Sequence, residues 1–341
     1  MEKVIDYRSD TLTVPEEGLL KQIYMADVGD DVYGEDHETA KLQEMVSKML
    51  GKEESLFVPT GTMANLIALM IYSSNGGEVI MDKNSHPIHY ESGGISRVAG
   101  LTPCFAEDSD GIMDPVSIIS LIRQDIYYQP KTVLIWLENT HNRGGGTVYP
   151  IKRLSEIRDI SKKYSLPIHI DGARILNACV FLNKEPSDIA RYCDSLSLCF
   201  SKGLSSPLGS MLTGSAEFIK KARIFRKMLG GGMRQIGYIS YIALFYLKRY
   251  KQLLRDDHQK AGMIYNALKN MGTPDPLWGG TNIVLARFRS INARESFENA
   301  LKSHGILVSS LSPESVRIVT SRSQDLRDIE KTVRIIGDLH L

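Results

Sequence analysis

The feature that most constrains the fold is a regular change of apolar period in the middle of the chain. Short apolar or β-branched runs alternate there with longer amphipathic stretches, and strands are predicted at residues 78–81, 132–137, 167–170, 195–200 and 209–213. Between two of these strands, residues 151–164 place Leu154, Ile157 and Ile160 three positions apart among charged residues, which predicts a helix with one buried face. A parallel strand needs such a crossover helix. The sequence therefore predicts an α/β fold with a mostly parallel central sheet.

The period changes twice towards the C-terminus. After about residue 218 the apolar spacing is helical, through the glycine run 230–232 and on to about residue 268. From residue 281 the pattern predicts strands at 282–288, 306–310 and 315–320, with helices at 293–303 and 326–339. We therefore expect a large domain over residues 1–250, including the N-terminal segment, and a small α+β domain over residues 251–341.

Composition excludes several classes of protein. Of the 341 residues, 43% are hydrophobic and 24% are charged, which excludes a disordered or collagenous chain. The 41 basic and 40 acidic residues nearly cancel, so no global field attracts nucleic acid or an anionic membrane. No apolar run approaches the ~20 residues of a membrane span, and the charged N-terminus does not resemble a signal peptide. The four cysteines have no zinc-site spacing, so we expect reduced thiols in a cytoplasmic protein.

The most informative local pattern pairs a lysine with an acid. The apolar run 195–200 is followed by Lys202, and the run 167–170 is followed by Asp171, 31 residues upstream, which is about the length of one βαβ crossover. Both side chains would then lie at the carboxyl edge of neighbouring strands, where open α/β sheets bind ligands. A lysine and an acid at that edge suit pyridoxal phosphate: the lysine bonds the cofactor, and the acid keeps the pyridine nitrogen protonated. Taken alone, such a lysine is more often a solvated strand end.

A phosphate group requires its own binding site. Gly61 and Thr62 lie in a turn between an apolar run and a helical stretch, and the N-terminus of a helix offers free N–H groups and a positive dipole end. Most such turns are simple helix caps.

Two histidine segments also follow predicted strands. One contains His86, His89 and Glu91, and the other contains His141 and Asn142. These histidines could be structural, could bind a metal, or could belong to the site at the sheet edge. Their position after strand ends favours the last interpretation.

Arg317 lies in an alternating strand of the small domain. A buried guanidinium is costly unless it meets an anion, and a substrate carboxylate at the domain junction would satisfy it. A paired arginine on an edge strand is the alternative.

Taken together, these segments resemble the threonine aldolases, glycine-forming lyases with pyridoxal phosphate on the aminotransferase-like type I fold. The resemblance covers nearly the whole chain. The matching segments are RSDT (8–11), VGDDVYGED (28–36), PTGTMAN (59–65), SHPIHYESGG (85–94), LENTHN (137–142), HIDGARI (169–175), SKGL (201–204), GSML (209–212), RKMLGGGMRQ (226–235) and VRIVT (316–320).

The resemblance implies a role for each matching residue. Lys202 would bond the cofactor, Asp171 would meet the pyridine nitrogen, and Arg174 would lie on the ring hydroxyl side. Cleavage of a small β-hydroxy amino acid to glycine and an aldehyde is implied, without a metal. The other implied site residues are Gly61 and Thr62 for the phosphate, Lys227 and Arg234 for a neighbouring subunit's phosphate region, Ser9 and Arg317 for the substrate carboxylate, His86 over the cofactor ring, His141 near the substrate hydroxyl, and Tyr33 in the pocket.

Several points stay open at this stage. The resemblance implies a homo-oligomer with shared active sites, as a dimer of dimers, and leaves open whether His86, His141 or a water takes the hydroxyl proton. Ser321 stands where the family often has histidine, which affects the edge of the substrate pocket. The alternatives are β-elimination or transamination on the same fold, an assembly protein without activity, and a metal-dependent hydrolase. The hydrolase would use His86, His89, Glu91, His141, His169 and Asp171.

Overall fold

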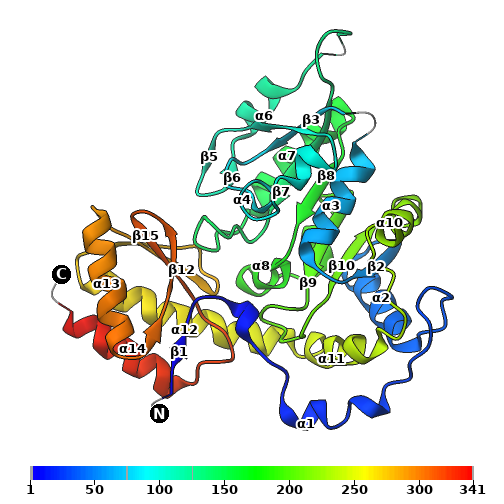
Figure 1. Cartoon of the computed structure of the whole chain (residues 1–341). Coiled ribbons are helices and arrows are strands. Elements are labelled where there is room, and N and C mark those ends of the chain that lie inside the picture. Colours follow the sequence, from blue (N-terminus) through cyan, green and yellow to red (C-terminus); the bar gives the residue numbers. More distant parts are fainter. Residues whose placement is uncertain (1–2, 74–75, 125, 340–341) are drawn as a thin grey trace.

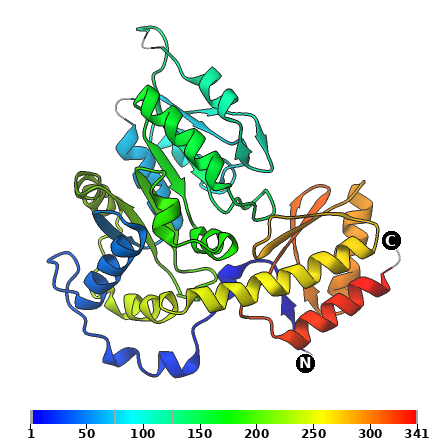
Figure 2. The same cartoon turned by 180° about the vertical axis from the view of Figure 1, so that it is seen from behind.

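The computed structural model describes residues 3–73, 76–124 and 126–339. It consists of two packed units that share one long helix, α12 (Tyr250–Asn270), drawn in yellow in Figures 1 and 2. The larger unit contains a seven-stranded sheet in the order β2-β10-β9-β8-β7-β3-β4. Strand β10 runs in the opposite direction to the other six strands, which all run the same way. Its strands are β2 (Glu54–Val58), β3 (Glu78–Met81), β4 (Thr102–Phe105), β7 (Thr132–Glu138), β8 (Ile168–Asp171), β9 (Ser195–Cys199) and β10 (Ser210–Gly214). The prediction of a mostly parallel sheet is confirmed.

Helices cover both faces of this sheet, which explains why its strands are continuous apolar runs. One face packs against α3 (Gly61–Tyr72) and α10 (Ala216–Met228). The opposite face packs against α2 (His37–Leu50), α7 (Ile151–Tyr164), α8 (Ile175–Leu182) and α11 (Gly237–Leu247). Helix α7 has the predicted bounds, and its residues Leu154, Ile157 and Ile160 are buried in that core.

The smaller unit is built on an antiparallel sheet in the order β11-β12-β15-β14. Its strands are β11 (Asp275–Trp278), β12 (Ile283–Arg287), β14 (Ser309–Ser312) and β15 (Ser315–Val319). A second core forms from this sheet, the C-terminal half of α12, α13 (Ile291–Ser303) and α14 (Leu326–Asp338). Because the N-terminal half of α12 packs into the first core, the helix ties the two units together.

The first residues of the N-terminal segment lie with the small unit, whereas Leu19 packs in the core of the large unit, where the sequence analysis placed the whole segment. Strand β1 (Ile5–Asp6) pairs in parallel with β13 (Ile306–Leu307), and Ile5 and Tyr7 are buried in the second core. This pairing joins residues about 300 positions apart, and no local period reveals it. It also brings the residues that follow β1 to the junction of the two units.

Two further expectations were wrong in detail. The run 306–310 is two short strands, because β13 pairs with β1 and β14 pairs with β15. The helical stretch after residue 218 is interrupted: α10 ends at Met228, Gly230 adopts a left-handed conformation with φ of 81°, and α11 begins at Gly237. A left-handed glycine is the usual stop for a helix.

The remaining elements are short. They are α1 (Glu17–Leu20), α4 (His86–His89), α5 (Gly94–Arg97), α6 (Pro115–Leu121), α9 (Pro186–Ala190), the strands β5 (Asp108–Ser109) and β6 (Ile112–Met113), and the 3₁₀ turns Asp10–Leu12 and Ile23–Met25.

No helix in the described ranges is long and apolar enough to cross a membrane.

Candidate active site

Several polar side chains meet where the parallel strands end. Asp171 is the last residue of β8, and Lys202 follows β9. Glu138 is the last residue of β7 and lies opposite Asp171 in the sheet. The turn before α3 follows β2, and His86 follows β3. The predicted convergence at the carboxyl edge of the sheet is therefore present in the structure.

The Lys202 turn packs against the turn after β8. The side chain of Lys202 is half-buried and, together with Ala173 and Arg174, lines a small cavity of about 10 Å³. The Lys202 carbonyl accepts hydrogen bonds from the Ser205 amide (2.8 Å) and the Thr13 hydroxyl (2.8 Å). These bonds fix the backbone from which the lysine amine extends.

Asp171 is held by donors on both carboxylate oxygens. Oδ1 accepts from the Ala173 amide at 3.1 Å, and Oδ2 accepts from Asn65 Nδ2 at 2.7 Å. The same nitrogen of Asn65 also donates to Glu91 Oε1 at 2.8 Å. The amide oxygen of Asn65, Oδ1, accepts from the Ser197 hydroxyl at 3.1 Å. Since all of these groups are buried, the amide of Asn65 separates two carboxylates that would otherwise repel each other.

Glu91 in turn binds His86, with 2.8 Å between Oε1 and Nδ1. Burial lowers the pKa of His86, but the hydrogen bond to Glu91 and the charges of Asp171, Glu91 and Glu138 outweigh burial and raise it above its ordinary value. Burial and the charge of Asp171 raise the pKa of Glu91 as well, against the effect of His86. Nδ1 of His86 is thus engaged by Glu91, and the outer ring nitrogen, Nε2, makes no hydrogen bond to a described residue.

The turn before α3 fits a phosphate group. Thr60 caps the helix by accepting from the Met63 amide at 3.1 Å, which leaves the first-turn amides of Gly61 and Thr62 without intrahelical partners. A Cβ at Gly61 would lie only 2.7 Å from Cys199 Sγ. The glycine therefore lets the helix N-terminus approach β9 closely.

Arg174 has a partner that the sequence analysis did not assign. Its guanidinium donates twice to Asp10, at 2.8 and 2.7 Å, and both side chains are buried. Burial raises the pKa of Asp10, but the charge and hydrogen bonds of Arg174, with smaller contributions from Lys202 and Asn282, lower it to about 2. The pair fastens the N-terminal segment to the sheet edge beside Lys202.

Arg317 is the contrasting case, because it is half-buried and has no carboxylate partner among the described residues. Nη1 donates to Asn142 Oδ1 (2.8 Å), Nη2 donates to the Arg8 carbonyl (3.0 Å), and Nε is buried without a partner. Burial and the charge of Arg174 lower its pKa, with Asp10 and Tyr90 acting in the opposite sense. Arg317 forms no ion pair within the described ranges, so it retains the capacity to bind an anion.

Ser9 lies beside this arginine, because Arg8 supplies one of the acceptors of Arg317. The Ser9 hydroxyl oxygen accepts from the amide and the hydroxyl of Thr11, at 3.2 and 2.8 Å, so its own hydrogen is available to a ligand. Ser9 is therefore one residue from a contact of Arg317, and its role in binding the carboxylate stays a prediction.

The position of His141 differs from the expectation. The ring is 1% exposed, Nε2 lies 2.9 Å from Asp82 Oδ1, and Nδ1 accepts from the Gly144 amide at 3.0 Å. Since both ring nitrogens are engaged inside the protein, His141 cannot exchange a proton with a substrate in this geometry. We therefore withdraw His141 as a candidate base and regard it as a support of the turn after β7.

Three predicted residues lie apart from this cluster within one chain. Tyr33, Lys227 and Arg234 are exposed, and no described contact joins them to Lys202. They lie near one another: the Arg234 guanidinium carbon is 5.8 Å from the centre of the Tyr33 ring, and Nη1 pairs with Asp30 at 2.9 Å.

Part of the ligand set of a metal hydrolase also comes together. One atom each of His86, Glu91 and Asp171 could lie within 4.8 Å of the others. However, the Asn65 amide donates hydrogen atoms to both carboxylates of this group, and a donor at that place repels a cation. His89 is exposed, and His169 is buried against Trp136 with Nδ1 bonded to Ser195, so neither supports a metal site.

Sequence reasoning missed some residues of this site. Asn65 lies inside the motif after the phosphate turn, one helical turn from Gly61, so its position on α3 could have indicated it. Asp10 follows Ser9 directly, but its partner is 164 residues away. Asn142 and Glu138 form part of the same support, because Glu138 accepts from the amides of His86 (2.7 Å) and Asn142 (2.8 Å).

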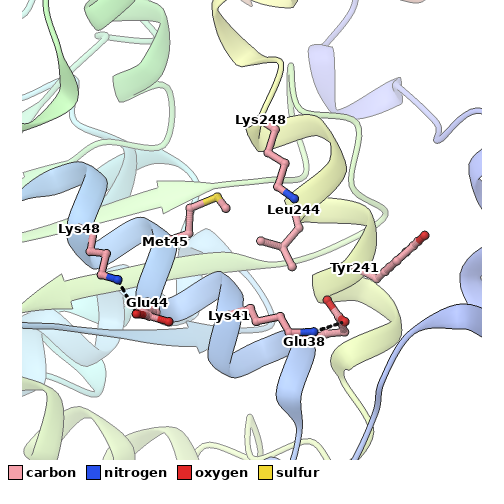
Figure 3. A pocket seen from close by; sticks show the side chains of 8 residues that line it. All are labelled: Glu38, Lys41, Glu44, Met45, Lys48, Tyr241, Leu244 and Lys248. Atoms are coloured by element: carbon pink, nitrogen blue, oxygen red, sulfur yellow. Dashed lines mark hydrogen bonds and ion pairs between the residues drawn. The ribbon is translucent and has the colours of Figure 1, made fainter.

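A surface groove lies elsewhere on the large unit. It runs between α2 and α11, has a volume of about 560 Å³, and is shown in Figure 3. On α2, Lys41 pairs with Glu38 and Lys48 pairs with Glu44, and none of the groove's side chains belongs to the cluster above. The lining residues are Glu38, Lys41, Glu44, Met45, Lys48, Tyr241, Leu244 and Lys248.

Comparisons with known proteins show the family to which the chain belongs. The family model described as beta-eliminating lyase matches residues 6–290. Low-specificity L-threonine aldolase 1 of Arabidopsis thaliana is 37% identical over 337 residues, which cover 96% of this chain and 94% of the relative. Low specificity L-threonine aldolase of Escherichia coli K12 is 38% identical over 318 residues, 93% of each protein. The solved structure of Leishmania major threonine aldolase superposes with a TM-score of 0.82 at 20% identity, covering 97% of this chain and 98% of that one.

Proposed function

Since the chain belongs to the beta-eliminating lyase family, we propose that it is a threonine aldolase that uses pyridoxal phosphate. It cleaves L-threonine, L-allo-threonine and related β-hydroxy-α-amino acids to glycine and an aldehyde, and is thus a carbon–carbon lyase. The observation that carries the proposal is the convergence of Lys202 and Asp171 on one edge of the sheet, with the uncompensated Arg317 of β15 bonded to Asn142 in the turn after β7.

The cofactor fits the residues that are present. Gly61 and Thr62 would bind the phosphate through their amides, and Lys202 would bond the cofactor. Asp171, already oriented by Asn65 and Ala173, would hold a proton at the pyridine nitrogen. When bound, pyridoxal phosphate supplies an electron sink for the bonds at Cα of the substrate.

The other residues orient the substrate and move its proton. Arg317, with Ser9 beside it, would bind the carboxylate; its planar fork can fix the rotation about Cα and so select the Cα–Cβ bond for cleavage. His86 is the proposed acceptor of the β-hydroxyl proton, because its Nε2 is open to the site and its Nδ1 is held by Glu91. Proton transfer of this kind typically contributes 10²- to 10⁴-fold to the rate.

We also propose that two subunits share each active site. Lys227, Arg234 and Tyr33 are exposed and lie apart from Lys202 in one chain, as is expected for side chains that complete a neighbour's phosphate site. A dimer of dimers is the proposed assembly. The proposed location is the cytoplasm, in agreement with the four free cysteines.

The test of the function is a product assay on protein loaded with pyridoxal phosphate. We expect glycine and acetaldehyde from threonine and allo-threonine, and no pyruvate from serine or tyrosine. Pyruvate without glycine would instead identify a β-eliminating enzyme. Mixing inactive Lys202→Ala with inactive Arg234→Ala chains tests the shared site, because hybrid dimers should recover part of the activity.

A further inference from the structure

An additional arginine, Arg143, lies next to the proposed substrate site. It follows Asn142, which accepts a hydrogen bond from Arg317, and its Nη1 donates to the Tyr90 hydroxyl at 2.8 Å. Arg143 is half-buried and forms no ion pair with the residues that the structure describes. The side chain is thus a cation without a counter-charge of its own.

Tyr90 connects this arginine to the proposed base. Its ring centre lies 5.1 Å from the ring centre of His86, so the Tyr90–Arg143 pair extends from His86 towards the turn that supports Arg317. The α-carboxylate is assigned to Arg317 and the β-hydroxyl to His86. The space next to both groups is where the rest of the substrate side chain would lie.

We propose that Tyr90 and Arg143 form a subsite for a carboxylate at the end of the substrate side chain. The preferred substrates are then β-hydroxy-α-amino dicarboxylic acids, of which β-hydroxyaspartate is the smallest. This inference rests on the proposed function, because it assumes that Arg317 and His86 bind the α-carboxylate and the β-hydroxyl.

Three physical arguments support the subsite. The Tyr90 hydroxyl accepts from Arg143 and can still donate its own hydrogen, and the guanidinium keeps further donors, so this corner offers several donors to a ligand. Arginine suits a planar carboxylate because two parallel hydrogen bonds can form. In addition, the charge of Arg143 contributes to lowering the pKa of Arg317, so the two cations repel each other. A dicarboxylate would neutralise both, whereas threonine presents only a methyl group.

The experiment compares kcat/KM for β-hydroxyaspartate and for threonine with the loaded enzyme. Cleavage of β-hydroxyaspartate yields glycine and glyoxylate. We expect a wild-type ratio above one and a fall of the ratio by about tenfold or more in Arg143→Gln, since a charged hydrogen bond to the substrate is lost. Tyr90→Phe should lower the ratio several-fold. Arg289→Gln, an exposed arginine beyond β12, is the matched control and should leave the ratio unchanged.

The outcomes separate the two proposals. If threonine is cleaved but Arg143→Gln leaves the ratio within about twofold, the subsite is wrong and the proposed function stands. If neither substrate is cleaved, the proposed function is wrong. Equilibrium binding then still tests the subsite: the loaded protein should bind L-aspartate more tightly than L-alanine, and Arg143→Gln should abolish that preference. An unchanged preference would overturn the subsite.

Discussion

Two arginines at the junction of the units, the buried Arg174 and the half-buried Arg317, differ in how their charges are compensated. Arg174, after β8, has its own carboxylate in Asp10, and the two form a bidentate pair. Arg317, on β15, contacts only the neutral oxygens of Asn142 and Arg8 and leaves Nε unpaired. The first arginine therefore holds the structure together, whereas the second is available to a ligand.

The two histidines after neighbouring strands differ in the same way. Both ring nitrogens of His141 form hydrogen bonds, to Asp82 and Gly144. His86 uses one ring nitrogen to bind Glu91, and its other ring nitrogen has no partner among the described residues. In each pair, the residue with a remaining unsatisfied atom is the one that we assign to the chemistry. Four predictions test this distinction.

The largest effect on stability is expected from breaking the Asp10–Arg174 pair. Arg174→Leu should lower the free energy of unfolding by about 3–5 kcal/mol, because it leaves a buried carboxylate unpaired. Arg317→Leu, the matched control, should change it by less than about 1 kcal/mol or raise it, since it removes a half-buried cation that has no counter-charge. Urea titrations of both variants measure this. An equal loss of unfolding free energy in the two variants would contradict the distinction between the two arginines.

The reverse order is expected for substrate binding. Arg317→Leu should raise KM for threonine by about 100-fold, because the carboxylate loses charged hydrogen bonds. Arg317→Lys should recover only part of this, since an ammonium cannot form the planar fork. Steady-state kinetics separate KM from kcat. A normal KM in the leucine variant would show that the carboxylate binds elsewhere.

The histidines can be compared by the same substitution. His86→Asn should lower kcat by about 10²-fold with little change in unfolding free energy, because it removes the proton acceptor from a half-open position. His141→Asn should instead cost about 1–3 kcal/mol of stability, because buried partners lose their hydrogen bonds. Parallel kinetics and urea titrations test the pair. Greater loss of kcat in the His141 variant, at unchanged stability, would restore that residue as the base.

The smallest effect concerns pH. Glu91 is among the groups that raise the pKa of His86, so Glu91→Gln should lower that pKa. Since neutral His86 is the proposed base, the acidic limb of the kcat/KM profile should move to lower pH by about one unit. A limb that moves to higher pH, or does not move, would mean that another group accepts the proton.

The sequence was informative for site residues that directly follow an apolar run. Each strand end that carries Asp171, Lys202 or His86 is preceded by an apolar run, and parallel strands bring such ends to one edge. The contacts between distant segments were not predictable in this way. Asp10 and Arg174 are 164 residues apart, and β1 and β13 pair across almost the whole chain.

The contrast between the histidines was also hidden in the sequence. Both follow strands and both lie in segments that resemble the family, but burial and hydrogen-bond partners distinguish them, and these depend on tertiary packing. Asn65 illustrates the same limit, because its role depends on lying between Asp171 and Glu91 in space.

The most direct test of the account is the site at which the cofactor is attached. The protein loaded with pyridoxal phosphate is treated with borohydride, digested, and analysed by mass spectrometry. We expect one pyridoxyl adduct per chain, on Lys202, and none in Lys202→Ala. An adduct on a different lysine, or an unmodified Lys202 in protein that has bound the cofactor, would contradict the proposed active site.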